Sequence, residues 1–113
     1  MSGLEVVEQH LIFVRAQNSE GMAANYSQNA VLRRPGAKFV GQHQIAGYFG
    51  TVADRLGKGA VAFEDPAEQT DGTIVVRWSI EGGPSSGTQG VDTYVVQGGM
   101  IVEQTVVLLG SDF

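Results

Sequence analysis

Side chains between residues 90 and 109 alternate between two faces, as the residues of β-strands do. The alternation is interrupted at Gly98-Gly99, a pair that suits the two-residue turn of a β-hairpin. The first strand would carry one row of Val91, Thr93 and Val95 and an opposite row of Asp92, Tyr94 and Val96. The second strand would carry Val102, Gln104, Val106 and Leu108 on the Asp92 side, and Ile101, Glu103, Thr105, Val107 and Leu109 on the other. Because the second strand is apolar on both faces, we expect it in the middle of a sheet.

Three segments have the period of helices. Ser2 and Glu5 have the spacing of a capping box, and they precede a helix over residues 3–16. Its apolar stripe consists of Leu4, Val7, Leu11 and Val14. A short second helix begins at Asn18, with Met22 and Tyr26 on one side, and ends in a polar turn at residues 27–29. The third helix covers residues 41–56 and stops at Gly57. Its inward residues would be Ile45, Phe49, Val52 and Leu56.

Short extended segments fill the rest of the chain. Residues 30–34 and 38–40 flank Pro35-Gly36, which favours a type II turn. From Gly59 onward the period becomes two, Pro66 suggests an edge strand, and Asp71-Gly72 forms a turn into another strand. That strand would place Ile74, Val76, Trp78 and Ile80 on one face. Helices followed by a four-stranded meander predict an α+β fold, in which a cone-shaped curved antiparallel sheet wraps around three N-terminal helices and encloses a pocket.

Length and charge limit the function classes. With 113 residues, the chain forms a single domain over residues 1–113. The net charge is -5 with only 7 Lys and Arg, which argues against nucleic acid and anionic membrane surfaces as partners. The sequence has no cysteine, no leader pattern and no apolar run long enough to span a bilayer, so we expect a cytoplasmic protein.

Two stretches resemble the SnoaL-like proteins, which are related to ketosteroid isomerase within the nuclear transport factor two-like superfamily. They are NYSQNAVLRRPGAKFVGQHQIAGYF at residues 25–49 and GVDTYVVQGGMIVEQTVV at residues 90–107. The resemblance covers nearly the whole chain and implies the cone fold. The family includes isomerases, polyketide cyclases, dehydratases, epoxide hydrolases and binding domains without catalysis, so the resemblance does not define the reaction.

The resemblance also allows a comparison of catalytic positions. Ketosteroid isomerases have a catalytic aspartate before the proline that follows the first strand, and Arg34 holds that position here. Their oxyanion tyrosine on the first helix falls near Leu11 and Ile12, which have no proton to donate. Their second oxyanion donor, an acid kept protonated by apolar surroundings, matches Asp92. The tyrosine and asparagine of limonene epoxide hydrolase would fall near Leu32 and Arg34, so neither reaction transfers directly.

Asp92 is the first candidate catalytic residue. Burial in an apolar cavity would raise the pKa of its carboxyl group and make it a useful acid or base. A structural role is the alternative, in which Asp92 accepts hydrogen bonds from the backbone or Tyr26, or pairs with Arg34. Arg34 is the second candidate, because the resemblance points its guanidinium into the pocket, where it could hold a ligand oxygen. One of Arg33 and Arg34 must point inward, and the sequence alone does not decide which.

Other polar and aromatic residues are candidates for the pocket wall. Expected ligand-binding residues are Tyr26, Tyr48, Trp78, Tyr94 and Gln104, although core filling is the ordinary role of such aromatic residues. His43 and His10 are expected to be exposed. No His and carboxylate cluster has metal spacing and no nucleophile has an adjacent base, so we expect neither a metal nor another cofactor.

Two functions from different classes fit these residues. The first is a cofactor-independent acid-base enzyme, an isomerase, cyclase or related lyase or hydrolase, acting on an apolar oxygenated metabolite such as a polyketide, steroid-like or terpenoid compound. The second is a non-catalytic ligand-binding or dimerisation domain of the same fold. The apolar outer rows further predict a homodimer through the convex sheet face. Those rows include Val75, Val91, Thr93, Val95, Thr105, Val107 and Leu109.

Overall fold

The sheet is built around the hairpin that the alternation predicts. The computed structural model describes residues 2–110. Its elements are α1 (Gly3–Arg15), α2 (Ser19–Ala24), β1 (Tyr26–Arg34), β2 (Ala37–Val40), α3 (Gly41–Leu56), β3 (Ala60–Phe63), β4 (Ala67–Glu68), β5 (Ile74–Glu81), β6 (Gln89–Gln97) and β7 (Met100–Leu109). The sequence therefore predicts the α+β order of the elements and most of their bounds.

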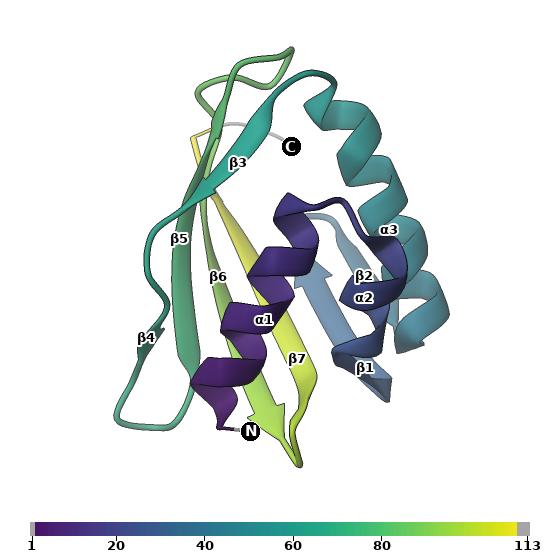
Figure 1. The fold of residues 1–113 in the computed structure, drawn as a ribbon, viewed down its shortest axis with the longest axis vertical. Helices are drawn as coiled ribbons and strands as arrows, with labels where there is room; N and C mark the ends of the chain where they lie inside the picture. Colours follow the sequence, from purple (N-terminus) through teal and green to yellow (C-terminus); the bar gives the residue numbers. More distant parts are fainter. Residues whose placement is uncertain (1, 111–113) are drawn as a thin grey trace.

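The strands form one curved sheet in the order β2-β1-β7-β6-β5-β3, with β4 also paired to β5. The central position expected for β7 is confirmed. One feature of the sheet differs from the expectation: β1 and β7 run parallel, so the sheet is mixed rather than wholly antiparallel. After β1, the polypeptide passes through α3 and the other strands before β7 returns to the side of β1. This long connection allows β7 to run in the same direction as β1. Figure 1 shows α1 lying across the inner face of the sheet, and α2 and α3 on the side of β1 and β2.

The residues expected to cap and to terminate the helices have these roles in the structure. Ser2 and Glu5 form a capping box at α1, each side chain bonding the other residue's backbone N–H. Asn18 caps α2 by accepting from the N–H of Gly21 at 3.0 Å. α3 covers the predicted residues and ends at Gly57, whose φ of 55° places it in a region that glycine adopts readily.

Two segments depart from the expected structure. Residues 27–29 belong to β1 rather than to a polar turn, so Tyr26 begins a strand instead of continuing a helix. Tyr26 pairs with Ile101 and Val31 with Glu103, on either side of a register shift, and these two anchor points keep the polar residues between them extended. Ile101, expected on the outer row of β7, is fully buried. A register shift between Val95 and Val96 pairs Val96 with Ile101, and this bulge turns the Ile101 side chain into the core.

The core lies between the concave face of the sheet and the helices. Its largest fully buried side chains include Tyr26, Tyr94, Leu11, Leu32, Ile45 and Ile74. The expected inner row of β5 is confirmed, because Ile74, Val76, Trp78 and Ile80 are all buried. No helix within residues 2–110 has the length and apolar character needed to cross a membrane.

A close approach between β5 and β6 holds one aromatic residue flat on the sheet. Trp78 pairs across the strands with Gly90. A Cβ atom at position 90 would lie 2.2 Å from Cζ2 of the Trp78 indole. Gly90 is therefore required for this position of the ring.

We predict that Gly90→Ala destabilises the protein by about 1 to 3 kcal/mol, because the added methyl group must displace Trp78. Gly47→Ala is the matched control, since Gly47 lies in α3 and a Cβ atom added there would meet nothing within 4 Å. It should stabilise the protein by about 0.5 to 1 kcal/mol through higher helix propensity. Urea unfolding of both variants measures the difference. Equal stabilities for the two variants would contradict this account of Gly90.

Candidate functional site

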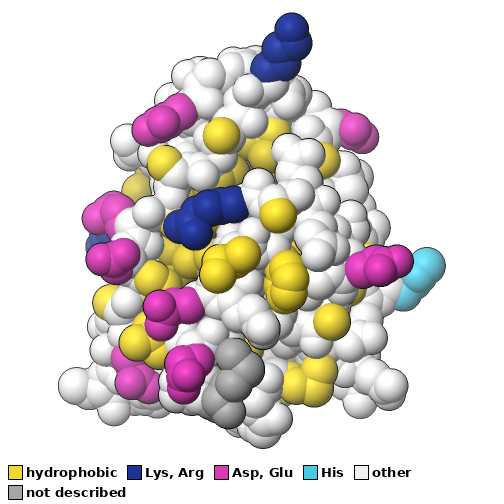
Figure 2. Space-filling model, viewed as in Figure 1, with side chains coloured by type: hydrophobic (Ala, Val, Ile, Leu, Met, Phe, Trp, Pro, Cys, Tyr) yellow, Lys and Arg dark blue, Asp and Glu magenta, His cyan; other side chains and the backbone are white. Residues whose placement is uncertain are grey.

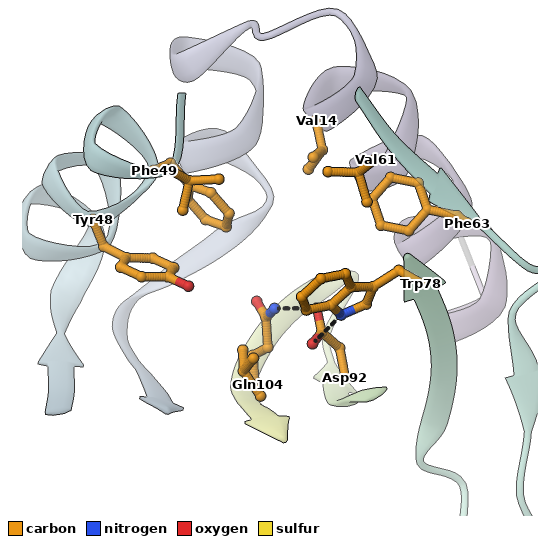
Figure 3. Close-up of a pocket in the computed structure, with 10 residues that line it drawn as sticks. Val14, Tyr48, Phe49, Val61, Phe63, Trp78, Asp92 and Gln104 are labelled. Carbon is orange, nitrogen blue, oxygen red and sulfur yellow. Dashed lines mark hydrogen bonds between the residues drawn. The ribbon is translucent and has the colours of Figure 1, made fainter. Parts of the chain in front are cut away.

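A small cavity opens between the helices and the concave face of the sheet. Its volume is about 50 Å³, which is room for a few water molecules. The wall residues are Val14 of α1, Tyr48, Phe49 and Val52 of α3, Val61 and Phe63 of β3, and Trp78, Asp92, Gln104 and Val106 of the sheet. Figure 3 shows Asp92 and Gln104 on the floor and the hydroxyl group of Tyr48 pointing inward across the cavity. The wall is thus apolar except at a few converging polar groups.

Asp92 is held by donors from three strands. Trp78 donates from Nε1 to Asp92 Oδ1 at 2.9 Å, and Gln104 donates from Nε2 to Oδ2 at 3.0 Å. Tyr94 donates from its hydroxyl group to the same Oδ2 at 3.4 Å. These bonds replace the water that the carboxyl group loses on burial.

Burial raises the pKa of the Asp92 carboxyl group to about 6, even though the bonds from Trp78, Gln104 and Tyr94 favour the ionised form. Desolvation therefore outweighs three hydrogen bonds. A carboxyl group with this pKa can both accept and release a proton close to neutral pH.

The polar contacts continue from Asp92 through the core. Tyr26 donates its hydroxyl hydrogen to Oε1 of Gln104. The same hydroxyl oxygen lies 3.3 Å from Nε2 of His10, whose Nδ1 lies 3.3 Å from Oδ1 of Asn25. A row of buried polar side chains thus extends from the cavity floor to α1 and the end of α2.

The expectation that His10 is exposed is wrong. His10 is fully buried, and burial lowers its pKa to about 4. Its position three residues after Val7 places it on the inner face of α1, beside Leu11. Ile12 instead points outward, with 60% of its surface exposed. Helical spacing could have identified His10, but its polarity argued for the surface. His43 is exposed, as expected.

Arg33 and Arg34 point in different directions. Arg33 is exposed and forms an ion pair with Glu103 of β7 at 3.2 Å. Arg34 is half-buried, and its guanidinium carbon lies 5.9 Å from the ring centre of Tyr48. Arg34 therefore lies behind a cavity residue and not on the cavity wall. The ion pair between Arg34 and Asp92 that the sequence left open is not formed.

The expected ligand-binding residues fall into two groups. Tyr48, Trp78 and Gln104 line the cavity. Tyr26 and Tyr94 do not, because both are buried beneath its floor, where they bond to Gln104 and Asp92. Burial raises the pKa of each phenol well above its usual range, so both remain protonated donors. Asn25 is a further member of the polar row, and nothing in the sequence singled it out.

Metal-binding side chains do not assemble within the described residues. No group of three or more His, Asp or Glu side chains in residues 2–110 is placed to hold a metal ion. Asp92 and His10, the buried members of these residue types, are separated by Gln104 and Tyr26.

A curved sheet packed against helices is also the fold of a nuclear transport factor two-like protein from Cytophaga hutchinsonii, which superposes with a TM-score of 0.77 at 11% identity, over 96% of this chain and 92% of that chain. The SnoaL-like domain model matches residues 7–104. The chain therefore belongs to the SnoaL-like domain family. No curated protein sequence matches it.

Solved structures show the same fold at low sequence identity. A candidate polyketide cyclase from Sinorhizobium meliloti superposes with a TM-score of 0.79 at 14% identity, over 90% of this chain and 93% of that chain. TerC, co-crystallised with polyporic acid, has a TM-score of 0.77 at 17% identity, over 93% and 89% of the two chains. A protein with a ketosteroid isomerase-like fold from Catenulispora acidiphila, in complex with trimethylamine, has a TM-score of 0.74 at 14% identity, over 94% of this chain and 85% of that chain.

The pKa of Asp92 predicts how Asp92→Asn changes the pH dependence of stability. The folded protein holds the Asp92 proton up to a pH of about 6, whereas the unfolded chain loses it near 3.8. Wild-type stability therefore loses a contribution of about 3 kcal/mol as pH rises through this window. The variant lacks this loss, so its stability relative to wild type should rise by about that amount between pH 3.8 and pH 6. Urea unfolding across this range measures the difference, and a flat difference curve would contradict the raised pKa.

Proposed function

We propose that this protein is a cofactor-independent acid-base enzyme, an isomerase, cyclase or related lyase or hydrolase, that acts on an apolar oxygenated metabolite such as a polyketide, steroid-like or terpenoid compound. The main observation that supports this proposal is a carboxyl group with a pKa of about 6 on the floor of an apolar cavity. A small-molecule ligand is supported by family membership, by a neighbour described as a candidate polyketide cyclase, and by a neighbour with a ketosteroid isomerase-like fold in complex with trimethylamine.

Asp92 would transfer the proton. In its ionised form it removes a proton from a carbon or hydroxyl group of the substrate, and it returns the proton at a second position of the same molecule. Trp78 holds Oδ1, whereas Oδ2 faces Gln104 and Tyr94, so the carboxyl group is fixed in orientation before the substrate binds. Gln104 also lines the cavity, and its amide nitrogen donates to Asp92 and to the hydroxyl group of Tyr94, so it would orient the carboxyl group rather than the ligand.

Negative charge on the substrate would be stabilised on the Tyr48 side. The guanidinium carbons of Arg34 and Arg55 lie 5.9 and 5.7 Å from the ring centre of Tyr48. Burial raises the pKa of Tyr48, and the positive charge of Arg34 partly opposes this effect. Tyr48 can therefore donate a hydrogen bond into the cavity with Arg34 behind it, which suits an enolate or carboxylate oxygen.

A metabolite needs more room than the cavity holds. Pockets for small molecules commonly have volumes of about 300 to 1,000 Å³, against about 50 Å³ here. We infer that apolar side chains at the mouth, such as Val52 and Phe63, move outward when a ligand binds.

A non-catalytic ligand-binding or dimerisation domain of the same fold is the alternative. It is favoured by Arg34 at the position where ketosteroid isomerases have their catalytic aspartate. In this alternative the buried row from Asp92 to His10 only stabilises the packing of α1 on the sheet.

We also propose a homodimer through the convex sheet face. Val107 and Leu109 leave 49% and 47% of their surfaces exposed, which is unusual for large apolar residues in a sheet. Figure 2 shows a different face, where apolar and acidic side chains are interspersed, with few basic ones. A second copy that covers the convex face would remove its apolar rows from water.

The enzyme proposal is tested by a thermal-shift screen of oxygenated polycyclic and terpenoid compounds, followed by product analysis with the ligands that raise the melting temperature. Asp92→Asn should lower turnover of the substrate found by about a hundredfold or more, because it removes the titrating proton and keeps the shape. A variant that binds the ligand and retains full turnover would rule out Asp92 as the acid or base.

Arg34 and Arg33 form a matched pair in this assay. Arg34→Met should weaken binding or turnover of an anionic or carbonyl ligand, because it removes the positive charge behind Tyr48. Arg33→Met should change neither, because Arg33 is exposed and pairs with Glu103. Equal effects of the two substitutions would exclude the proposed role of Arg34.

Sedimentation at micromolar concentration tests the dimer. Val107→Lys should produce a monomer, because it places a charge in the apolar convex face. Ile12→Lys is the matched control, since Ile12 is a comparably exposed apolar residue on α1 rather than on the sheet. A monomeric wild-type protein would contradict the proposed dimer.

A further inference from the structure

The buried polar row forms one continuous hydrogen-bond chain from the cavity to the surface. It passes from Asp92 to Gln104, Tyr26, His10 and Asn25. Asn25 donates in turn from Nδ2 to Oε1 of Gln9 at 3.3 Å, and Gln9 is exposed. All members except Gln9 are buried. These buried groups must therefore find their partners inside the protein. Tyr94 is a further partner beside the row, because its hydroxyl group donates to Asp92 Oδ2 at 3.4 Å and accepts from Gln104 Nε2 at 3.3 Å.

The hydroxyl group of Tyr26 has one hydrogen and faces two groups that could accept it. These are Oε1 of Gln104 and Nε2 of His10. When Gln104 accepts the hydrogen, Nε2 of His10 must donate to the hydroxyl oxygen. When His10 accepts it, Gln104 must present its NH₂ group to Tyr26 instead. The chain therefore has two directions.

The protonation of Asp92 selects the direction. Ionised Asp92 accepts from the NH₂ group of Gln104, so Tyr26 donates to Gln104 and His10 carries its hydrogen on Nε2. Nδ1 of His10 then carries no hydrogen and accepts a hydrogen bond from the NH₂ group of Asn25. The Asn25 amide must rotate to present this group, and it can do so because its partner Gln9 is exposed and can rotate with it. If Asp92 is protonated on Oδ2, it donates to Gln104 Oε1, and every link reverses. His10 then carries its hydrogen on Nδ1, where it faces Oδ1 of Asn25.

We propose that Gln104, Tyr26 and His10 are positioning residues for Asp92, and that their hydrogen-bond chain reverses direction whenever Asp92 gains or loses a proton. Gln104, Tyr26 and His10 together hold the same number of hydrogens in both directions, so Asp92 alone gains or loses the proton. Trp78 donates to Oδ1 in both states, because the reversal involves Oδ2. Both forms of Asp92 thus keep hydrogen bonds to Trp78 and Gln104. That the reversal helps catalysis rests on the proposed function, whereas the reversal itself does not depend on it.

Other titratable groups around the chain do not change charge in the same pH range. Those that face Asp92 or His10 are Tyr94 of β6, Tyr26 of β1 and Tyr48 of α3, with Arg34 and Arg55 against Tyr48. Burial raises the pKa of all three phenols, so they stay neutral near pH 6. Burial keeps His10 neutral down to a pH of about 4. Asp92 is therefore the group of this cluster that titrates near pH 6.

Nuclear magnetic resonance of the untagged, ¹⁵N- and ¹³C-labelled protein between pH 4.5 and 8 tests the reversal without a substrate. The sequence has two histidines, and exposed His43 is an internal reference that His43→Gln assigns. The ring nitrogen shifts of His10 should change from the Nε2–H to the Nδ1–H tautomer as pH falls. The midpoint should equal that of the Asp92 carboxyl carbon. A His10 tautomer that is the same on both sides of the Asp92 midpoint would overturn the proposal.

Three variants distinguish coupling of Asp92 and His10 through the hydrogen-bond chain from coupling that arises only because the two residues are close. Asp92→Asn should hold His10 in one tautomer throughout this range. Tyr26→Phe should leave the tautomer of His10 independent of Asp92, whereas Tyr48→Phe, which removes a hydroxyl group outside the chain, should retain the coupling. If the tautomer of His10 still switched with Asp92 in Tyr26→Phe, the proposed hydrogen-bond chain would be refuted. If this variant does not fold, the wild-type titration alone decides whether the proposal holds. A coupled switch together with full turnover in Asp92→Asn would preserve the chain and eliminate the proposed function.

Discussion

The burial of one carboxyl group sets the strictest requirement in this structure. Directly opposite Asp92 in the sheet are Val76 and Val106, both apolar and buried. Two of its donors come from diagonal positions, because Trp78 pairs with Gly90 and Gln104 pairs with Tyr94. The third donor, Tyr94, lies two residues further along β6. A slip of one residue in either register would turn these donors to the convex face. The carboxyl group therefore depends on the pairing of three strands and in turn stabilises that pairing.

The same requirement extends to elements far from the strand that carries Asp92. Gly90 leaves space for the indole ring that bonds Oδ1. The parallel pairing of β1 with β7 places Tyr26 beside Gln104, and α1 brings His10 against Tyr26. Polar groups from both ends of the chain thus meet in the core. Such a network specifies how α1 lies on the sheet, since sliding the helix would leave several buried groups without partners.

The sequence predicts those features that depend on local periodicity. The capping box at Ser2, the whole of α3 and the hairpin turn at Gly98-Gly99 follow from spacing alone. Alternation also places Asp92 on the inner face. What local patterns miss is contact between distant elements: the bulge that buries Ile101, the strand that begins at Tyr26, and the polar partners of His10. Histidine polarity argues for the surface unless Tyr26 and Asn25 are already known to be its partners.

Arg34 is a second residue whose contacts could not be predicted from the sequence. The family resemblance predicts that Arg34 faces the pocket, but its half-buried side chain ends against Tyr48 and not at Asp92. The separation has a chemical consequence. A guanidinium bonded to Asp92 would hold the pKa of the carboxyl group low and keep it ionised. Because Trp78, Gln104 and Tyr94 bond it instead, desolvation prevails and the pKa rises to about 6. The charge behind Tyr48 and the proton at Asp92 therefore remain on different sides of the cavity, an arrangement that the proposed acid-base reaction would use for proton transfer on one side and charge stabilisation on the other.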